Sequence, residues 1–583
     1  MTVPSSGRVM VRMPRAHFHS LMASLPARAF FGTGAIRPLF RSAYAAGLTT
    51  QHDQPVSQQT EWLLSHGEAT ERHPWDVAHD MVRGKTKGAT QFATGPDVYA
   101  EPDLLQPSPV PPAKIRKAAV ARVRSAAPVT GPPYRPGDLL IDYYPPAGDK
   151  FSPAWHLQKE FANFAGAWKT TTGAGVRIAH LDTGYTKGQD STPRNFLAAE
   201  GTNITDGTSD LTDIDTGEPW NMAGHGTATL ALLAGNKVNL QYDATGPVYN
   251  GDIGGAPDAS IVPVVISRSV IHLYTANVAE GLKYALSAPG GPCQVVSLSH
   301  GGLPSTTWAA AVNALYEAGV VVVAASGDSY SATVADIATH FTVYPSAFYR
   351  VVTATGVMFD NTPYTSHHLG ALQGCWGPDA VMKKALAAYT PNVAWMSFKS
   401  AHGWDMDGGG TSASTPQIAA ACALWLSKYG DQFPAGWTRV AACRHALFES
   451  AKDRGKDLTH IGVGTLDANE MLSQATLAKV QAAYKSQKLP FIQPDKVTSP
   501  FIRVLFGLPP PGPGVDEMYD TEAAQILFRS RNKDLVAAFQ DDPFGKKKLP
   551  PKKTKALRDA MIREPAISET LKNYLKGASK AIK

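Results

Sequence analysis

Three residues in the middle of the chain have side chains that could together attack a carbonyl group. Asp182 follows the apolar run GVRIAHL, His225 lies in GHGTAT, and Ser412 lies in GGGTSASTP. A serine hydroxyl is a poor nucleophile until a histidine takes its proton, and a buried carboxylate must orient that histidine. The small-residue run after Ser412 predicts a helix, whose first N–H groups would point toward a developing oxyanion. The three residues therefore predict nucleophilic catalysis.

Each of these residues also has a purely structural interpretation. Asp182 could cap the end of a strand, His225 could be a histidine at a helix start, and Ser412 could be a serine in a first helical turn. Their order and their sequence context together favour the catalytic interpretation over three unrelated structural ones.

Four apolar, β-branched segments predict the strands that would position these side chains. Each segment stops at small or polar residues and is followed by helix-like sequence, which is typical of buried parallel strands in an α/β sheet. Ligands of such sheets bind at the carboxyl ends of the strands, where Asp182, His300 and Asp328 stand. The strand segments are 175–184, 259–267, 293–302 and 319–328, and the helical segments are 225–235, 278–288 and 307–319.

The order of these residues and the sequences around them resemble the subtilisin-like serine proteases. The motifs DTG, GHGTAT and GTSASTP are all present, and the resemblance runs from about Trp155 to Leu472. It implies an α/β fold with a subtilisin-like three-layer α/β/α catalytic domain and a mainly parallel sheet. It also implies that Asp182 orients His225, that His225 is the general base and acid, and that Ser412 attacks the peptide carbonyl.

One position departs from the family pattern. In most subtilisin-like proteases the segment matching AASGD (324–328) ends in an asparagine that donates a hydrogen bond to the oxyanion, and here it ends in Asp328. An ionised carboxylate cannot donate, and loss of such a donor costs about 10²–10³ in rate. Asp328 could donate as a protonated acid, or the backbone N–H of Ser412 could carry the oxyanion hole. A shift of the alignment by a residue or two, with another donor serving, is a third interpretation.

The resemblance also implies two substrate-binding segments. The strand matching VVSLSHGG (295–302) would pair with the peptide substrate by β-augmentation, and AASG (324–327) would form the wall of the primary specificity pocket. The histidine of the first segment faces either a substrate side chain or solvent. The small side chains of the second predict a roomy, apolar pocket without charge. The predicted substrate-binding residues are Ser299, His300, Gly301, Ala325, Ser326 and Gly327.

Metal and disulfide chemistry have little support in the sequence. Four aspartates lie between positions 206 and 215, but their spacing does not match an EF-hand loop and favours a solvated acidic loop. We therefore expect no cofactor, although structural calcium is common in the family. The four scattered cysteines include no CxxC pair and predict reduced core thiols. The aspartates are Asp206, Asp210, Asp213 and Asp215, and the cysteines are Cys293, Cys375, Cys422 and Cys443.

The charge of the 583-residue chain is unevenly distributed. The net charge is +6, yet residues 1–50 contain six arginines and no Lys, Asp or Glu, and residues 544–583 contain twelve basic and three acidic residues. The stretch between them is therefore acidic. With 43% hydrophobic and 18% charged residues, wholesale disorder is excluded. No uncharged apolar run approaches 18 residues, so we expect no transmembrane segment.

The N-terminal residues 1–105 predict a small α+β domain. Strands are expected at 9–13, 35–40 and 97–105, with helices at 16–25 and from Pro74 onward. An Arg-rich targeting peptide is the alternative, since the apolar core of a secretion signal is missing. By resemblance, this domain is a propeptide that inhibits the enzyme, which would make the chain a zymogen cleaved in the Pro/Ala/Arg-rich linker 106–150.

The expected catalytic domain covers 151–475, and a basic extension, helical or partly disordered, covers 476–583. Residues 520–539 predict an amphipathic helix after the linker LPPPGPG (508–514). The run KKKLPPKKTK could bind nucleic acid or an anionic membrane, but the tail shows no nucleic-acid motif. A solvated extension, an unidentified partner, or docking on the acidic core of its own chain are the other interpretations.

Two classes of function follow. The favoured one is an active serine endopeptidase that hydrolyses polypeptides through an acyl-enzyme intermediate. The alternative is a catalytically weak binding or regulatory protein, which only Asp328 supports. The few cysteines and the missing secretion signal favour a cytoplasmic location, with secretion or organelle import as alternatives.

Overall fold

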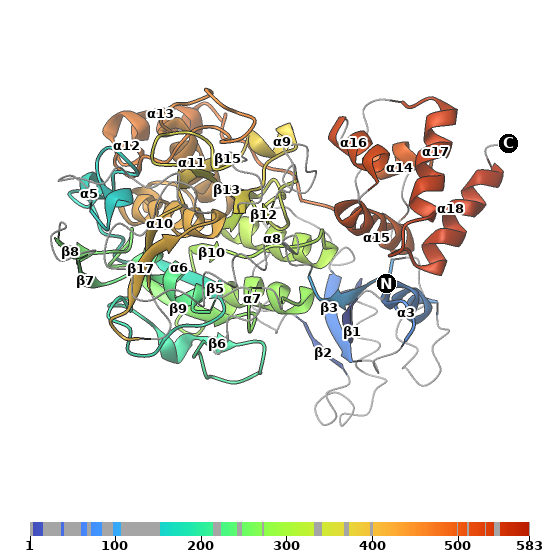
Figure 1. Ribbon diagram of the computed structural model, residues 1–583, viewed down its shortest axis with the longest axis horizontal. Coiled ribbons are helices and arrows are strands. Elements are labelled where there is room, and N and C mark those ends of the chain that lie inside the picture. Colours follow the sequence, from blue (N-terminus) through green and yellow to red (C-terminus); the bar gives the residue numbers. More distant parts are fainter. Residues whose placement is uncertain are drawn as a thin grey trace, which may run out of the picture.

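The computed structural model of the chain has three parts (Figure 1): a large α/β part, an N-terminal sheet and a C-terminal group of helices. The sheet and the C-terminal helices lie side by side at one end of the molecule. The described residues are 4–15, 36–39, 60–66, 71–83, 97–106, 152–213, 223–241, 248–270, 273–330, 341–365, 372–396, 400–497, 500–509, 512, 514–530, 532–541 and 548–581.

A seven-stranded parallel sheet forms the centre of the α/β part, as the sequence predicts. Its strand order is β15-β13-β11-β10-β5-β9-β6, and every neighbouring pair is parallel. The four predicted strand segments supply the four adjacent strands β11, β10, β5 and β9. The strands are β5 (Arg177–Asp182), β6 (Thr202–Asn203), β9 (Ser260–Val265), β10 (Val295–Leu298), β11 (Val321–Ala325), β13 (Val351–Val357) and β15 (Ala385–Tyr389).

Helices cover both faces of this sheet, because successive side chains of each strand point to opposite faces. Ile178 of β5 joins an apolar cluster with helices α6, α10 and α11, whereas its neighbour Ala179 joins a second cluster with α7 and α8. The result is the three-layer α/β/α arrangement expected from the resemblance. The helices are α6 (His225–Ala234), α7 (Thr275–Ser287), α8 (Thr306–Ala318), α10 (Thr411–Tyr429), α11 (Trp437–Glu449) and α13 (Gln474–Lys485).

Shorter elements surround these layers. Two-stranded antiparallel sheets are formed by β7 with β8, β12 with β14, and β16 with β17. The additional helices α5 (Phe164–Ala167), α9 (Asp379–Met382) and α12 (Ala468–Met471) span one turn each. The strands are β7 (Lys237–Gln241), β8 (Val248–Asp252), β12 (Asp328–Tyr330), β14 (Leu372–Gly374), β16 (Val393–Met396) and β17 (Trp404–Gly408).

The N-terminal sheet packs on the face of the α/β part that α7 and α8 cover. It is antiparallel with the order β2-β3-β1-β4, and α3 (Pro74–Val82) lies against it. Its apolar side chains share one buried cluster with Trp308 of α8. The helix expected at 16–25 lies outside the described residues. The strands are β1 (Ser5–Pro14), β2 (Ile36–Pro38), β3 (Thr60–His66) and β4 (Tyr99–Leu104), of which β3 was not predicted.

Carboxylates of β4 cap the helices beneath the N-terminal sheet. Asp103 Oδ1 accepts from the backbone N–H of Ala276 at 2.7 Å, in the first turn of α7. Glu101 Oε2 accepts from the backbone N–H of Thr307 at 3.1 Å, in the first turn of α8. Both carboxylates are fully buried. Because free N–H groups at a helix start favour a negative charge, these two contacts fix the sheet on the α/β part.

The C-terminal residues form a helical bundle with its own apolar core. Residues 520–539, expected as one helix, belong to two: α15 ends at Arg529, and Asn532 accepts from the N–H groups that begin α16. The basic tail is folded into this core through Leu557 and Leu571. Within the described residues, no helix has both the length and the apolar character needed to cross a membrane. The helices are α14 (Pro500–Phe506), α15 (Val515–Arg529), α16 (Lys533–Asp541), α17 (Pro551–Ile562) and α18 (Glu569–Ala581).

Candidate active site

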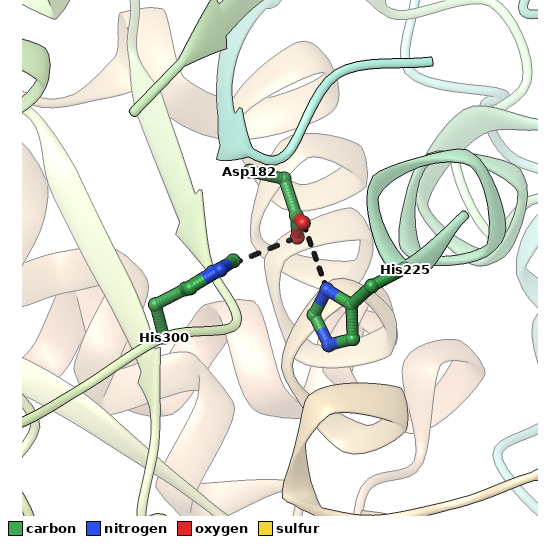
Figure 2. Close-up of side chains that lie close together, drawn as sticks. All are labelled: Asp182, His225 and His300. Carbon is green, nitrogen blue, oxygen red and sulfur yellow. Dashed lines mark hydrogen bonds and ion pairs between the residues drawn. The ribbon is translucent and has the colours of Figure 1, made fainter. Parts of the chain in front are cut away.

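The structure brings Asp182 and His225 into direct contact. Asp182 is the last residue of β5 and His225 the first residue of α6, and Asp182 Oδ1 lies 2.7 Å from His225 Nδ1 (Figure 2). A side chain at Gly226 would place its Cβ 2.2 Å from the Gly184 carbonyl oxygen, so only glycine lets the helix start approach the strand end this closely. The second glycine of GHG therefore permits the contact between Asp182 and His225.

Two further donors hold the Asp182 carboxylate in place. The backbone N–H of Thr183 donates to Oδ1 at 2.8 Å, and the hydroxyl of Thr229 donates to Oδ2 at 2.9 Å. Sequence reasoning did not single out Thr229, although it stands four residues after His225 in the predicted helix. On a helix, residues four apart lie on the same face, and this spacing could have identified it.

Burial and charge set the protonation of this pair. Burial favours a higher pKa for Asp182, but the neighbouring histidines, His225 foremost and then His300 and His180, together outweigh it and hold that pKa well below its usual value. Burial likewise favours a lower pKa for His225, but the Asp182 carboxylate outweighs it and raises that pKa above 6.5. The carboxylate is therefore ionised, and the imidazole gains basicity, as a general base requires.

Ser412 lies in the first turn of α10, one residue after the helix begins at Thr411. Gly410, the residue before the helix, has φ +76°, and a Cβ there would lie 2.8 Å from Asp328 Oδ2. The Ser412 hydroxyl donates to the Ser299 carbonyl at 3.2 Å, and the Ser299 hydroxyl donates to the Ser412 carbonyl at 3.0 Å. His225 Nε2, the ring nitrogen that does not contact Asp182, is buried and has no hydrogen-bond partner.

Asp328 lies directly against the start of the same helix. Its Oδ1 accepts from the backbone N–H of Thr411 at 2.9 Å, and its Oδ2 lies 3.3 Å from the Thr411 hydroxyl. Burial raises the pKa of Asp328 to about 6, although the hydrogen bonds from Thr411 oppose the shift. Its carboxyl group thus contacts the residue immediately before Ser412, and its pKa lies not far below neutral pH.

His300 is buried, so the expectation that it faces solvent is wrong, whereas a contact with a substrate side chain stays a prediction. The residue is only 3% exposed, and its ring packs against that of His225 with 5.2 Å between centroids. Its Nδ1 lies 3.9 Å from Asp182 Oδ2, so His300 and His225 both approach the same carboxylate (Figure 2). Val296 and Leu298, which precede it at a spacing of two, are buried on the same face of the sheet. Strand alternation therefore could have predicted its burial.

The predicted pocket segments come together, but the space between them is not roomy. A Cβ at Gly301 would lie 2.3 Å from a methyl group of Val343, and a Cβ at Gly327 would lie 2.8 Å from its other methyl group. Ala325 and Ser326 are buried at the end of β11. The half-buried Val343 thus fills the region between the two glycines. The expectation of a roomy pocket is wrong here, because it considered only the small side chains of the wall.

The acidic segment 206–213 is not a uniformly solvated loop. Asp206 forms an ion pair with Arg268, whereas Asp213 is 3% exposed and accepts a 2.7 Å hydrogen bond from the Thr183 hydroxyl. Asp213 thereby supports the turn that follows Asp182. Asp210 is exposed, and Asp215 lies outside the described residues. The four cysteines are buried, and none of them forms a disulfide.

The chain leaving the N-terminal sheet enters the edge of the predicted substrate cleft. The backbone N–H of Gln106 donates to the Leu273 carbonyl at 2.8 Å, and its side-chain Oε1 accepts from the N–H of Leu303 at 2.7 Å. A Cβ at Gly302 would lie 2.3 Å from that same Oε1. Gln106 therefore occupies the space beside the segment that contains Ser299, His300 and Gly301.

Comparisons with known proteins agree with this geometry. A sequence profile described as the subtilase family matches residues 173–464. Alkaline elastase YaB of Bacillus sp. (strain YaB) is 26% identical over 301 residues, covering 51% of this chain and 64% of that protein. Subtilisin Savinase of Lederbergia lenta is 28% identical over 276 residues, covering 47% of this chain and 82% of that protein.

The alignments differ in how much of each relative they include. The chain spans less than two thirds of alkaline elastase YaB and 58% of an alkaline protease of Alkalihalobacillus alcalophilus. A solved structure of the prenylagaramide maturation protease PagA matches with a TM-score of 0.39 and 17% identity, covering 53% of this chain and 96% of that chain. The family profile spans half of the 583 residues and includes Asp182, His225 and Ser412. The chain belongs to the subtilase family.

Proposed function

We propose that this protein is a serine endopeptidase that hydrolyses peptide bonds of polypeptide substrates through Asp182, His225 and Ser412. The observation that carries the proposal is the buried 2.7 Å contact between Asp182 and His225, with the second histidine nitrogen lacking a partner. A relative named as an alkaline protease, from Alkalihalobacillus alcalophilus, supports the same chemistry.

The proposed reaction has two halves. Ser412 Oγ attacks the carbonyl carbon while its proton moves to His225 Nε2, and the C–N bond then breaks as the leaving amine takes that proton. This step leaves the acyl group on Ser412. A water molecule attacks the ester next, again giving its proton to His225, and the serine and a carboxylic acid are regenerated.

The oxyanion formed in each half needs hydrogen-bond donors. Ser412 is in the first turn of α10, where the backbone N–H groups have no acceptor within the helix. Asp328, against the neighbouring Thr411, can supply a second donor only in its protonated form. The alternative of a catalytically weak binding protein rests on this residue alone, and relatives named as proteases do not favour it.

Intact-mass spectrometry with a fluorophosphonate probe tests the catalytic proposal. We expect the probe to add one label to the wild-type protein at pH 8, because only an activated serine reacts. The Ser412→Ala variant should stay unlabelled, and Ser414→Ala, at a buried serine two residues further along α10, should still react. Absence of label on the wild-type protein at both pH 5 and pH 8 would favour the binding protein instead.

We further propose that residues 1–105 act as an inhibitory propeptide and that the chain is a zymogen cut between 104 and 150. The position of Gln106 supports this, because its side chain lies against Gly302 and Leu303, at the end of the predicted substrate-binding segment. The same mass spectra report the cut: the wild-type chain should appear as two shorter masses, and Ser412→Ala should remain full length. If both remain full length while the probe still labels Ser412, self-processing is wrong.

The substrate class follows from the pocket between Gly301 and Gly327. Since the methyl groups of Val343 occupy this space, we propose that the enzyme prefers a small side chain, such as Ala, immediately before the scissile bond. A large aromatic side chain there would have to displace Val343, and a packed site tolerates added volume poorly.

Replacing Val343 by glycine is expected to enlarge this pocket. We expect the kcat/KM for a peptide with Phe before the scissile bond to rise about tenfold, which corresponds to about 1.4 kcal/mol, while the matching Ala peptide changes less than threefold. The same replacement at Val248, which is 56% exposed on β8, is the control and should alter neither substrate. Equal effects on both peptides would show that Val343 does not line the pocket.

A further inference from the structure

Helix α15 of the C-terminal bundle contacts both other parts of the molecule. Thr521 Oγ1 lies 3.2 Å from the Tyr99 hydroxyl of β4 and 2.9 Å from Thr306 Oγ1 at the start of α8. Two turns further along, Phe528 packs against Tyr344 of the α/β part with 5.4 Å between ring centroids. The helix therefore lies across the seam where the N-terminal sheet meets the α/β part.

Gln525, also on α15, joins the two parts through a single side chain. Its Oε1 accepts from the indole N–H of Trp75 on α3 at 3.0 Å, and its amide donates to the Pro304 carbonyl at 3.0 Å. The same amide lies 3.4 Å from Glu101, the carboxylate that caps α8. Gln525 is 3% exposed, and both partners are buried hydrogen-bonding groups that would be left unsatisfied if α15 moved away.

The bundle also contacts helix α3 and strand β1 of the N-terminal domain. Asp76 of α3 caps α18: its Oδ1 accepts from the N–H of Thr570 at 2.8 Å, and its Oδ2 accepts from the N–H of Glu569 at 3.2 Å. Arg12 of β1 pairs with Glu517 of α15 at 2.6 Å. The ring of His79 on α3 packs against a tyrosine of α15, 4.7 Å between centroids.

We propose that the C-terminal bundle, residues 500–581, is a clamp that holds the N-terminal domain on the α/β part, so that cutting the linker does not by itself release the domain. Two surfaces then retain the domain after the cut: the capped helices α7 and α8 below it, and α15 with α18 beside it. The inference that the clamp keeps the enzyme inhibited rests on the proposed function. The inference that the bundle retains the N-terminal domain concerns binding alone.

The clamp makes release of the N-terminal domain a separate step from cleavage. A domain held by two surfaces of the same partner dissociates only when both are broken together, since either surface alone keeps the other at a high effective concentration. Activation would then require a further event at the bundle, such as its removal or displacement.

The test measures dissociation in a protein that cannot digest itself. In Ser412→Ala, a recognition sequence for a site-specific protease is placed within residues 110–145, the linker is cut, and loss of the N-terminal fragment is followed by size-exclusion chromatography. We expect the fragment to stay bound in the parent protein. The charge reversals Arg12→Glu and Glu517→Arg should each raise its dissociation rate about tenfold, because each places like charges at the former 2.6 Å pair.

The combined variant Arg12→Glu with Glu517→Arg restores opposite charges and should return the dissociation rate to within about threefold of the parent. Lys555→Glu reverses an exposed charge on α17 that pairs with Asp559 of the same helix, and should leave the rate unchanged. Immediate loss of the fragment from the parent, or equal rates in parent and single reversals, would overturn the clamp. Because Ser412 is absent, neither result depends on whether the protein is a protease.

Discussion

Asp182→Asn is expected to lower kcat/KM by about 10⁴ while leaving the fold intact. Asparagine fills the same volume, but its amide can turn its own N–H₂ toward His225 Nδ1 and so favour the tautomer with the proton on Nε2. That nitrogen could then no longer accept the serine proton. Steady-state hydrolysis of a peptide substrate gives the rate, and thermal unfolding checks that the variant is folded.

Asp213→Asn is the matched control for this experiment. Asp213 is also a buried aspartate near this site, where it accepts from the Thr183 hydroxyl, whereas Asp182 is the carboxylate that contacts His225 Nδ1. We expect its replacement to reduce kcat/KM by less than tenfold. A loss of less than 10² in Asp182→Asn would mean that Asp182 does not orient the general base.

Asp328→Asn is expected to change activity in the opposite direction, raising kcat/KM by about 10² at pH 8. With a pKa of about 6, the Asp328 carboxyl group is protonated in about 1% of molecules at pH 8, and only that fraction can donate to the oxyanion. An asparagine donates at every pH and carries no charge that repels the oxyanion.

The pH dependence of kcat/KM distinguishes the effect of Asp328 ionisation from a general increase in activity at every pH. In the wild-type protein, Asp328 must be protonated, which favours pH below about 6, whereas His225 must be neutral, which favours pH above its own raised pKa. We therefore expect a narrow bell-shaped profile of kcat/KM, and Asp328→Asn should abolish its alkaline limb. The gain at pH 6 should accordingly be only about twofold.

Asp328→Ala provides the control, because it removes the charge without supplying a donor. At pH 8 we expect the kcat/KM of Asp328→Ala to stay well below that of Asp328→Asn. If Asp328→Asn leaves kcat/KM at pH 8 unchanged or lower, Asp328 does not lie at the oxyanion, and the backbone N–H of Ser412 serves without it.

The central sheet was predictable because its strands are buried on both faces. Such strands are continuous apolar runs, and 175–184 and 319–328 stand out from the helical sequence between them. Strand β3 (Thr60–His66) is not predicted by its sequence, because TEWLLSH mixes polar and apolar residues without clear alternation. The break between α15 and α16 lies in the polar run 529–534, where Asn532 caps the second helix, and this run could have predicted two helices instead of one.

Short sequence motifs predict the contact between Asp182 and His225, but they do not predict which other side chains surround this pair. GHGTAT places the histidine at a helix start, and tight glycine contacts make that motif distinctive. His300 and Val343, by contrast, act through neighbours that are distant in the chain. Val343 meets Gly301 and Gly327 only after the chain has folded, and nothing in its local sequence signals that contact.

The position of the C-terminal bundle beside the first strands has a consequence for synthesis of the protein. Chains emerge from the ribosome N-terminus first, so the N-terminal sheet and the α/β part are complete before α15 and α18 exist. Arg12 is made 505 residues before its partner Glu517. A chain that stops short of the bundle would therefore contain every residue of the candidate active site and lack the clamp.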